Sequence, residues 1–291
     1  MRSLLRLREL FFETGFKVKG IRPGHLKLHC FRIYTNHSIP FIFVLRHLFM
    51  NLPFFYTDNI DTGSKDMVLN EDNSRHVVGV LRMNAGGQMH LTDGKGQLLT
   101  AIITDPNKKK CRVSITGIQQ TAPPERKTAI GISLVKNPVR FEWFLEKATE
   151  IGITAFFPLL CARTEKQHFR PDRMKNILVS ALLQSRQTWL PVLHEPVKFE
   201  QMVAQQEFDQ KFIAHCTEDN KQDLSSSLIN PLRSQLLLIG PEGDFTTGEI
   251  ALALQHQFVA VGLGETRLRT ETAGLVAAVL LRHQQVHTNA S

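Results

Sequence analysis

Short aliphatic runs alternate with amphipathic segments over the second half of the chain. "TAIGISLV", "ITAFFPLL", "KFIAHC", "LLLIG" and "FVAVGLG" are typical of strands covered on both faces. Between them, "RFEWFLEKATEIG" has Phe141, Phe144 and Ala148 at helical spacing, and Gly152 suits its C-terminal cap. "PDRMKNILVSALLQSRQTW" and "TAGLVAAVLLRHQQ" predict two more helices. This alternation predicts a mostly parallel α/β sheet.

The pattern differs between Phe54 and about Gln120, where all the signals are those of β-strands. "GQMHLTDGKGQLLTAIIT" predicts two strands around the turn 93–96, and "KKKCRVSITGI" alternates again. Several short strands with intervening turns predict a small β-barrel. "TAPPERK", residues 121–127, is a stiff proline linker. We therefore expect a barrel over residues 50–122 and an α/β domain over residues 125–288.

The net charge of +8 is concentrated in one segment. Residues 1–49 hold nine Lys/Arg and two Glu, a net of +7, so the remaining 26 Lys/Arg and 25 Asp/Glu of residues 50–291 give +1. The first segment has no clean periodicity, and its apolar run "IPFIFVL" is too short to span a bilayer. A basic RNA-binding arm and a targeting peptide are two interpretations. We prefer a third, in which translation starts at Met50 and residues 1–49 are a non-native or disordered extension.

Several kinds of chemistry lack their sequence signals. The four cysteines are scattered, which disfavours zinc and disulfide frameworks and suits a reducing cytoplasm. There is no GxxxxGK[ST] loop and no GxSxG elbow. "GLGETR" lacks the third glycine of a dinucleotide fingerprint, which disfavours a dehydrogenase. His283 and His287 lie one helical turn apart without a third ligand, so we expect no metal site.

Two glycine-rich loops remain, "GPEGDFTTGE" and "GLGETRLRTETAG", and each follows an apolar strand and precedes a helix. Thr246 and Glu249 have the spacing of a capping box at the start of the first helix. Glycines let main-chain groups approach a flat ligand closely, and ligands bind at such strand ends in open α/β sheets. Two ordinary solvated turns are the alternative. Together the loops predict a site for an adenosine-type ligand.

These loops resemble the paired signature of the RsmE family, 16S rRNA uridine-N3 methyltransferases of the SPOUT superfamily. "RHVVGVLRMNAGG" resembles that family's motif in its N-terminal PUA-like barrel. "FLEKATEIGITAFFPLLCARTE" and "SALLQSRQTWLP" resemble two further blocks of its catalytic domain. The resemblance covers about residues 51–287 and nothing before Met50.

The resemblance implies an α/β C-terminal SPOUT domain with a trefoil knot behind a PUA-like RNA-binding barrel. It also implies S-adenosyl-L-methionine as cofactor, a homodimer, and a cytoplasmic enzyme without a membrane or metal partner. Its substrate is expected to be one uridine near the decoding centre of 16S rRNA, methylated at N3 in the assembled small ribosomal subunit. A SPOUT enzyme acting on another RNA such as tRNA, and an RNA-binding protein without catalysis, are the alternatives.

The resemblance also carries residues into roles. Arg269 is expected to stabilise a forming uridinate, and Glu271 to act as base or orienter. Glu242 is expected either to orient the cofactor loop or to brace it. The expected cofactor-binding residues are Cys216, Thr217, Ile239, Gly240, Pro241, Glu242, Gly243, Leu263, Gly264, Leu268, Arg269 and Thr270. The expected RNA contacts are Arg75, His76, Arg82, Arg163 and Arg186.

Two departures from the family pattern lie in these loops. Family members often have Gly-Gly after Pro-Glu, where this chain has Gly243-Asp244. In the second loop the first arginine is displaced by one position, to Arg267, whereas Arg269 keeps the position of the family's second arginine.

Overall fold

The computed structural model describes residues 52–58, 60, 64–165, 168–204, 208–217, 221–228 and 234–282. The expected extension 1–49 lies outside these residues, and so do His283 and His287. None of the helices in this part of the chain has the length and apolar character needed to cross a bilayer.

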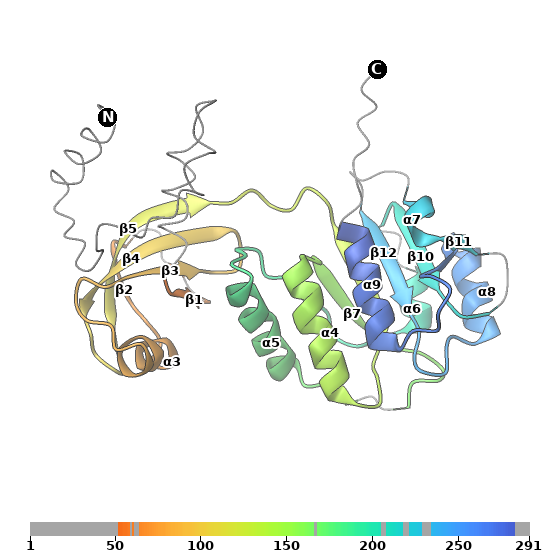
Figure 1. Cartoon of the computed structure of the whole chain (residues 1–291), viewed down its shortest axis with the longest axis horizontal. Coiled ribbons are helices and arrows are strands. Elements are labelled where there is room, and N and C mark those ends of the chain that lie inside the picture. Colours follow the sequence, from red (N-terminus) through yellow and green to blue (C-terminus); the bar gives the residue numbers. More distant parts are fainter. Residues whose placement is uncertain are drawn as a thin grey trace, which may run out of the picture. The chain divides into compact units, whose positions relative to one another are not determined.

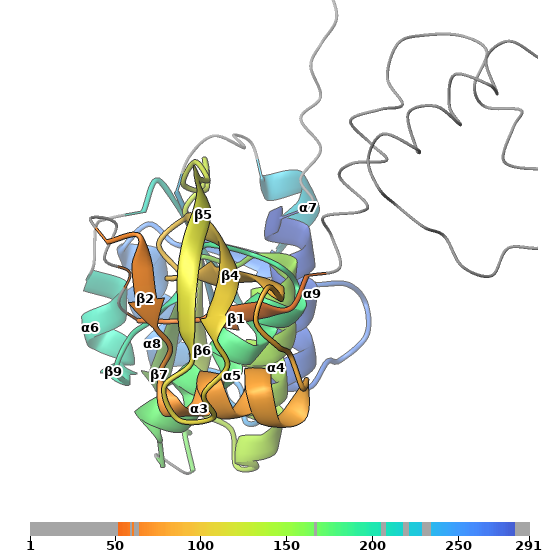
Figure 2. The same ribbon diagram turned by 90° about the vertical axis from the view of Figure 1, so that its left-hand side faces the viewer.

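The N-terminal strands form one five-stranded sheet in the order β1-β3-β4-β5-β2 (Figure 2). The predicted turn is confirmed: it joins β3 to β4, with Gly94 and Gly96 at φ of 69° and 93°. Asp93 Oδ1 fixes this turn by accepting the main-chain N–H groups of Lys95 at 2.7 Å and Gln97 at 3.2 Å. The strands are Phe54–Tyr56 (β1), Asp66–Val68 (β2), Gln88–Thr92 (β3), Gln97–Asp105 (β4) and Arg112–Gln120 (β5).

A helical insertion interrupts this β region, where only strands were expected. It consists of the short helix α3, Glu71–Ser74, and a π-helical turn, Arg75–Val80 (η2). Asn70 caps α3 by accepting the Asn73 N–H at 2.8 Å, and Val77 is fully buried against the sheet. The expectation of continuous β-structure was wrong here because a local cap and one buried side chain favour the helical turn.

The second sheet has eight strands, all joined by parallel pairings, so the predicted mostly parallel α/β sheet is confirmed. Its order is β11-β13-β10-β12-β6-β7-β8, with β9 also paired to β7. The strands are Thr128–Ser133 (β6), Ala155–Leu160 (β7), Val192–Leu193 (β8), Val197–Lys198 (β9), Gln210–Ala214 (β10), Gln222–Asp223 (β11), Gln235–Ile239 (β12) and Val259–Gly262 (β13).

Helices cover both faces of this sheet (Figure 1). Leu237 and Ile239 of β12 pack in the same core cluster as α4, Pro138–Ile151, and α9, Thr270–Arg282. The alternate residues Leu236 and Leu238 pack in a second cluster. The remaining helices are α5, Pro171–Gln184, on the first face, α6, Phe199–Ala204, and α8, Thr247–Gln255, on the second, and the single turn α7, Leu224–Ser227. Burial on both faces explains why β12 is wholly apolar after Gln235.

Several helix boundaries follow the sequence signals. Gly152 ends α4 at a φ of 97°, and the capping box of Thr246 and Glu249 begins α8, as predicted. The helix α5 ends at Gln184, before the predicted end near Trp189. The reason is a contact with a distant part of the chain: Arg186 takes a φ of 55°, and the next residues turn so that Trp189 forms an isolated bridge with Lys95 of the β3–β4 turn.

The order of the central strands positions three loops together. The strand β10 lies between β12 and β13, and all three run parallel. Ala214 and Ile239, the last residues of β10 and β12, are register partners, and Ala214 also pairs with Val261, one residue before the end of β13. The segments that follow these ends therefore meet at one edge of the sheet.

Candidate functional site

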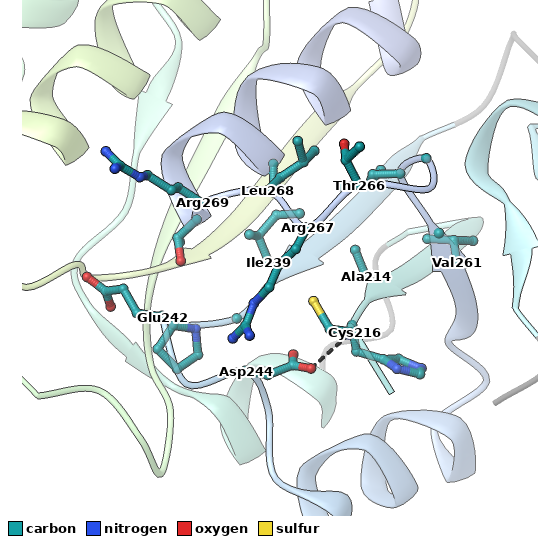
Figure 3. A pocket seen from close by; sticks show the side chains of 18 of the residues that line it. Ala214, Cys216, Ile239, Glu242, Asp244, Val261, Thr266, Arg267, Leu268 and Arg269 are labelled. Atoms are coloured by element: carbon teal, nitrogen blue, oxygen red, sulfur yellow. Dashed lines mark hydrogen bonds between the residues drawn. The ribbon is translucent and has the colours of Figure 1, made fainter. Parts of the chain in front are cut away.

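A cavity of about 660 Å³ lies at this edge, within the size range of small-molecule sites (Figure 3). Three segments line it: the residues after β10, the loop after β12 and the loop after β13. The helix starts of α4 and α9 add to the wall. The lining residues are Arg140, Ala214, His215, Cys216, Lys221, Ile239, Gly240, Pro241, Glu242, Asp244, Val261, Gly262, Leu263, Gly264, Glu265, Thr266, Arg267, Leu268, Arg269, Thr270 and Ala273.

The loop after β12 folds back tightly on itself. A Cβ at Gly240 would lie 3.1 Å from the main-chain nitrogen of Phe245, so this position has little room for a side chain. The Asp244 N–H donates to the Pro241 carbonyl at 2.9 Å, and Asp244 has a left-handed φ of 64°. Phe245 is buried against Phe199 and anchors the end of the loop. The tight turn expected from the glycines and proline is therefore present.

Side chains tie this loop to its neighbours. Glu242 Oε1 accepts the main-chain N–H of Lys136, after β6, at 3.0 Å. Of the two roles expected for Glu242, this contact is that of a brace. Arg163, after β7, donates to the Gly243 carbonyl at 2.6 Å. Glu249 is buried at the start of α8, where it completes the capping box and also accepts the Ala162 N–H at 2.8 Å.

The loop after β13 supplies the opposite wall. Gly264 has a φ of 116°, and a Cβ built on it would meet nothing within 4 Å, so this stretch of main chain faces open space. Figure 3 shows the Arg267 side chain extended across the cavity toward Asp244, whereas the Arg269 side chain points away from its centre. Both arginines belong to the lining, with Arg140 and Lys221 as further cations.

Glu271 lies behind this wall. It is buried in the first turn of α9, and its Oε1 lies 3.6 Å from Nε of the lining residue Arg140. Glu271 is not part of the lining. Of its two expected roles, this arrangement suits an orienter, because its carboxylate contacts a guanidinium that faces the cavity.

The structure brings most of the expected cofactor-binding residues into this one cavity. Thr217 and Gly243 are the exceptions. The Thr217 hydroxyl lies 2.6 Å from Nδ1 of His215, and Gly243 faces Arg163. Sequence reasoning missed Arg140, Lys221 and Asp244. Asp244 directly follows the "GPEG" motif, but the family pattern has glycine at this position, so no role for a carboxylate was predicted.

The expected RNA contacts lie on other surfaces. Arg75 and His76 are exposed in η2, where Arg75 pairs with Glu71 at 2.9 Å and the His76 ring stands edge-on to Phe55. Arg82 and Arg186 are exposed at positive φ. Arg163 is exposed but holds the loop after β12.

A basic turn was missed by the sequence reasoning. Lys108, Lys109 and Lys110 are exposed between β4 and β5. Asn107 Oδ1 orders this turn by accepting the N–H groups of Lys109 at 2.9 Å and Lys110 at 3.2 Å. The next residue, Cys111, donates its N–H to Ser74 Oγ at 3.0 Å, so the turn adjoins the start of η2. The run "KKK" could have been recognised from its charge alone.

The cavity has the features of a site for a polar, partly flat ligand. Ile239, Val261, Leu263 and Leu268 supply apolar surface, and the glycine-rich loops expose main chain. The four cations can hold a carboxylate. Within the described ranges, no group of His, Cys, Asp and Glu is arranged to hold a metal ion.

Comparisons with known proteins agree with this architecture. The family models described as "RNA methyltransferase domain" and "RNA methyltransferase PUA domain" match residues 122–282 and 69–116. The chain is 30% identical to the Bacillus subtilis ribosomal RNA small subunit methyltransferase E, over 72% of this chain and 86% of that protein.

Solved structures give the same result. A probable rRNA-methyltransferase from Porphyromonas gingivalis has a TM-score of 0.74 at 35% identity, covering 80% of this chain and 98% of that one. The ribosomal RNA small subunit methyltransferase E from Neisseria gonorrhoeae, bound to S-adenosyl methionine, has a TM-score of 0.70 at 28% identity, covering 79% and 96%.

The cavity geometry predicts unequal reactivity of the cysteines. Cys216 is exposed in the cavity wall, whereas Cys161 is buried and burial raises its pKa to about 12, so it stays a thiol at neutral pH. A short pulse of N-ethylmaleimide, followed by peptide mapping, should label Cys216 and leave Cys161 free. In urea both should react. Equal labelling of the two in the native protein would contradict the structure.

Proposed function

The chain belongs to the RsmE family of RNA methyltransferases, and we propose that it methylates N3 of one uridine near the decoding centre of 16S rRNA in the assembled small ribosomal subunit. As a member of this family, the chain is an S-adenosyl-L-methionine-dependent rRNA methyltransferase with an N-terminal PUA domain. A single observation best supports methyl transfer in this cavity: residues of the two family loops, 240–245 and 263–269, line it together.

The residues of the cavity fit the cofactor. Open main chain at Gly264 and apolar side chains such as Ile239 and Leu263 suit an adenosine. The guanidinium of Arg267, directed across the cavity, suits a carboxylate. We assign the cofactor to this cavity, with Cys216, Ile239, Gly240, Pro241, Glu242, Leu263, Gly264, Leu268, Arg269 and Thr270 as wall residues.

When bound, S-adenosyl-L-methionine supplies an electrophilic methyl group on a sulfonium. Positioning two reactants is worth about 7–11 kcal/mol, so the braced loops contribute by holding the cavity rigid. Uridine N3 must lose its proton to become a good nucleophile. We place the uracil ring on the side of the cavity to which Arg269 points, where the guanidinium stabilises the negative charge that then forms on the ring.

Glu271 acts as an orienter in this mechanism. Its buried carboxylate contacts Arg140, so it holds a second cation at the cavity wall. The N3 proton leaves to water, the N3–methyl bond forms, and the sulfonium–methyl bond breaks to leave a neutral thioether. Thr217 and Gly243 support the cavity from behind its lining.

The test combines labelled S-adenosyl-L-methionine with unmethylated small ribosomal subunits and reverse transcription across the rRNA. A methyl group at N3 blocks the Watson–Crick edge, so one strong stop near the decoding centre is expected. Arg269→Ala should lower the transfer rate by roughly 10²–10³, the scale for losing one oxyanion-stabilising group, and should weaken cofactor binding less than it slows transfer.

Arg267→Ala is the matched control in the same loop. It should weaken cofactor binding, measured by calorimetry, more than it slows transfer at saturating cofactor. A labelled tRNA instead of rRNA would overturn the substrate proposal. Cofactor binding without labelling of ribosomal subunits or tRNA would favour an RNA-binding protein without catalysis.

We propose that the barrel binds rRNA phosphates through η2 and the adjoining basic turn. η2 and the residues directly after it supply Arg75, His76 and Arg82, and the basic turn supplies Lys108–Lys110. The hydrogen bond from the Cys111 N–H to Ser74 Oγ joins the turn to η2. Arg186 extends the RNA-binding surface onto the methyltransferase domain. The Arg163 guanidinium donates a hydrogen bond through Nη1 to the Gly243 carbonyl, and its remaining N–H groups contact RNA phosphates in this proposal.

Replacing Lys108, Lys109 and Lys110 with alanine should therefore weaken subunit binding and flatten its salt dependence. Each lost phosphate contact reduces the slope of log K against log salt by about 0.7–0.9. A salt titration by filter binding measures this slope. Lys147→Ala is the control, because Glu146 and Glu150 already hold that ammonium. An unchanged slope in the triple variant would contradict the proposal.

We propose a homodimer formed through α4 and α9, with each cavity near the subunit interface. These helices pack side by side on the sheet (Figure 1), and they expose large apolar side chains. Val139 and Trp143 of α4 are 63% and 40% exposed, and Val279 of α9 is 41% exposed. Exposed apolar groups on neighbouring helices are typical of interfaces.

Sedimentation velocity tests this interface. The protein should sediment as a dimer at micromolar concentration, and Trp143→Arg with Val279→Arg should sediment as a monomer. Val192→Arg changes an apolar residue on β8 that is even more exposed, at 55%, and should stay dimeric. A monomeric wild-type chain, or a dimeric double variant, would contradict the proposed interface.

We further propose the trefoil knot of the SPOUT fold and a cytoplasmic site of action, where ribosomal subunits are available. The insertion of β10 between β12 and β13, and the shared cavity of their loops, support the knot. An experimental structure tracing residues 208–282 without breaks tests it, and a trace in which no segment passes through a loop would exclude it.

A further inference from the structure

Asp244 is the lining residue at which this chain departs from the glycine often found in its family. Its φ of 64° lies in the left-handed region, where glycine is unstrained and Asp and Asn are the best-tolerated alternatives. The backbone conformation therefore explains why glycine is common there. It does not explain why this chain carries a carboxylate that faces the cavity.

The two carboxylate oxygens of Asp244 have different partners. Oδ1 accepts the N–H of the next residue, Phe245, at 2.8 Å, which stabilises the turn itself. Oδ2 accepts the main-chain N–H of Cys216 at 2.8 Å, drawn as the dashed line in Figure 3. The second bond joins two segments that are 28 residues apart and follow neighbouring strands.

This bond joins the braced loop after β12 to the wall segment of the cavity that follows β10. The loop after β12 is held from the other side by Lys136 and Arg163. Ala214, His215 and Cys216, at and directly after the end of β10, form the neighbouring wall of the cavity. The hydrogen bond from the Cys216 N–H to Asp244 thus ties the wall that carries Cys216 to the braced loop.

We propose that Asp244 is a positioning residue that fixes the Cys216 wall of the cofactor cavity and thereby sets cofactor affinity. The inference rests on the proposed function only for the identity of the ligand. It acts through the accepted hydrogen bond, not through the charge. Glycine at this position leaves the Cys216 N–H without its partner. Asparagine tolerates the same φ and keeps one accepting oxygen for the Cys216 N–H, at the loss of the bond from the Phe245 N–H.

The test compares Asp244→Gly with Asp244→Asn in the full chain. Both residues suit the backbone, and thermal melting verifies that both variants fold. By calorimetry, Asp244→Gly should bind S-adenosyl-L-methionine about tenfold more weakly, the upper end of the scale for one lost hydrogen bond. Asp244→Asn should bind within about threefold of wild type.

A second readout needs no cofactor. Hydrogen exchange of the Cys216 amide, and the rate of Cys216 alkylation, should both rise in Asp244→Gly and stay near wild type in Asp244→Asn. A merely structural role elsewhere in the loop would not move these two rates together. This readout tests the tie even if the wild-type protein fails to bind the cofactor, an outcome that would overturn the proposed function instead.

Two results would overturn the inference. Wild-type affinity and unchanged Cys216 exchange in Asp244→Gly would show that the tie has no effect. Equal weakening of cofactor binding in both variants would show that the hydrogen bond accepted from the Cys216 N–H does not set the affinity.

Discussion

The parallel pairing of β10 with both β12 and β13 is the constraint on which the rest of the site depends. Because Ala214 is the register partner of Ile239 and Val261, three strands end at the same level. The segments that follow these strand ends therefore lie together at one edge of the sheet, and they enclose the cavity. Burial of β12 on both faces fixes that register, since a slip of one residue would exchange the side chains of the two cores.

Carboxylates around the cavity serve mainly as acceptors for main-chain N–H groups. Glu242 holds the segment after β6, Glu249 the segment after β7 and Asp244 the segment after β10. The loop after β12 and the start of α8 that follows it are thereby fixed to three neighbouring segments. The cations, in contrast, line the cavity or its rim, where they can meet an anionic ligand or a charge that forms during reaction. Rigid walls and adaptable cations together suit a reaction that depends on positioning.

The sequence predicted what depends on local pattern. Strand and helix alternation, the Gly152 cap, the Thr246 capping box and the Asp93 turn are all local signals, and all are present. Features that depend on contacts between distant parts of the chain could not be predicted from the sequence. The end of α5 depends on where Trp189 pairs, and the contacts of Asp244 and Glu271 are with residues far away in the chain. The cofactor and the RNA target came from the resemblance, because no spacing of residues encodes the atom that is methylated.

The most direct test of the central claim is the chemical identity of the modified nucleoside. Small ribosomal subunits treated with the protein and S-adenosyl-L-methionine would be digested to nucleosides and separated by chromatography with mass detection. The account predicts one 3-methyluridine per 16S rRNA and no other new methylated nucleoside. A new product that is methylated at carbon, at the ribose or on another base would contradict it, even with the cofactor bound in the cavity.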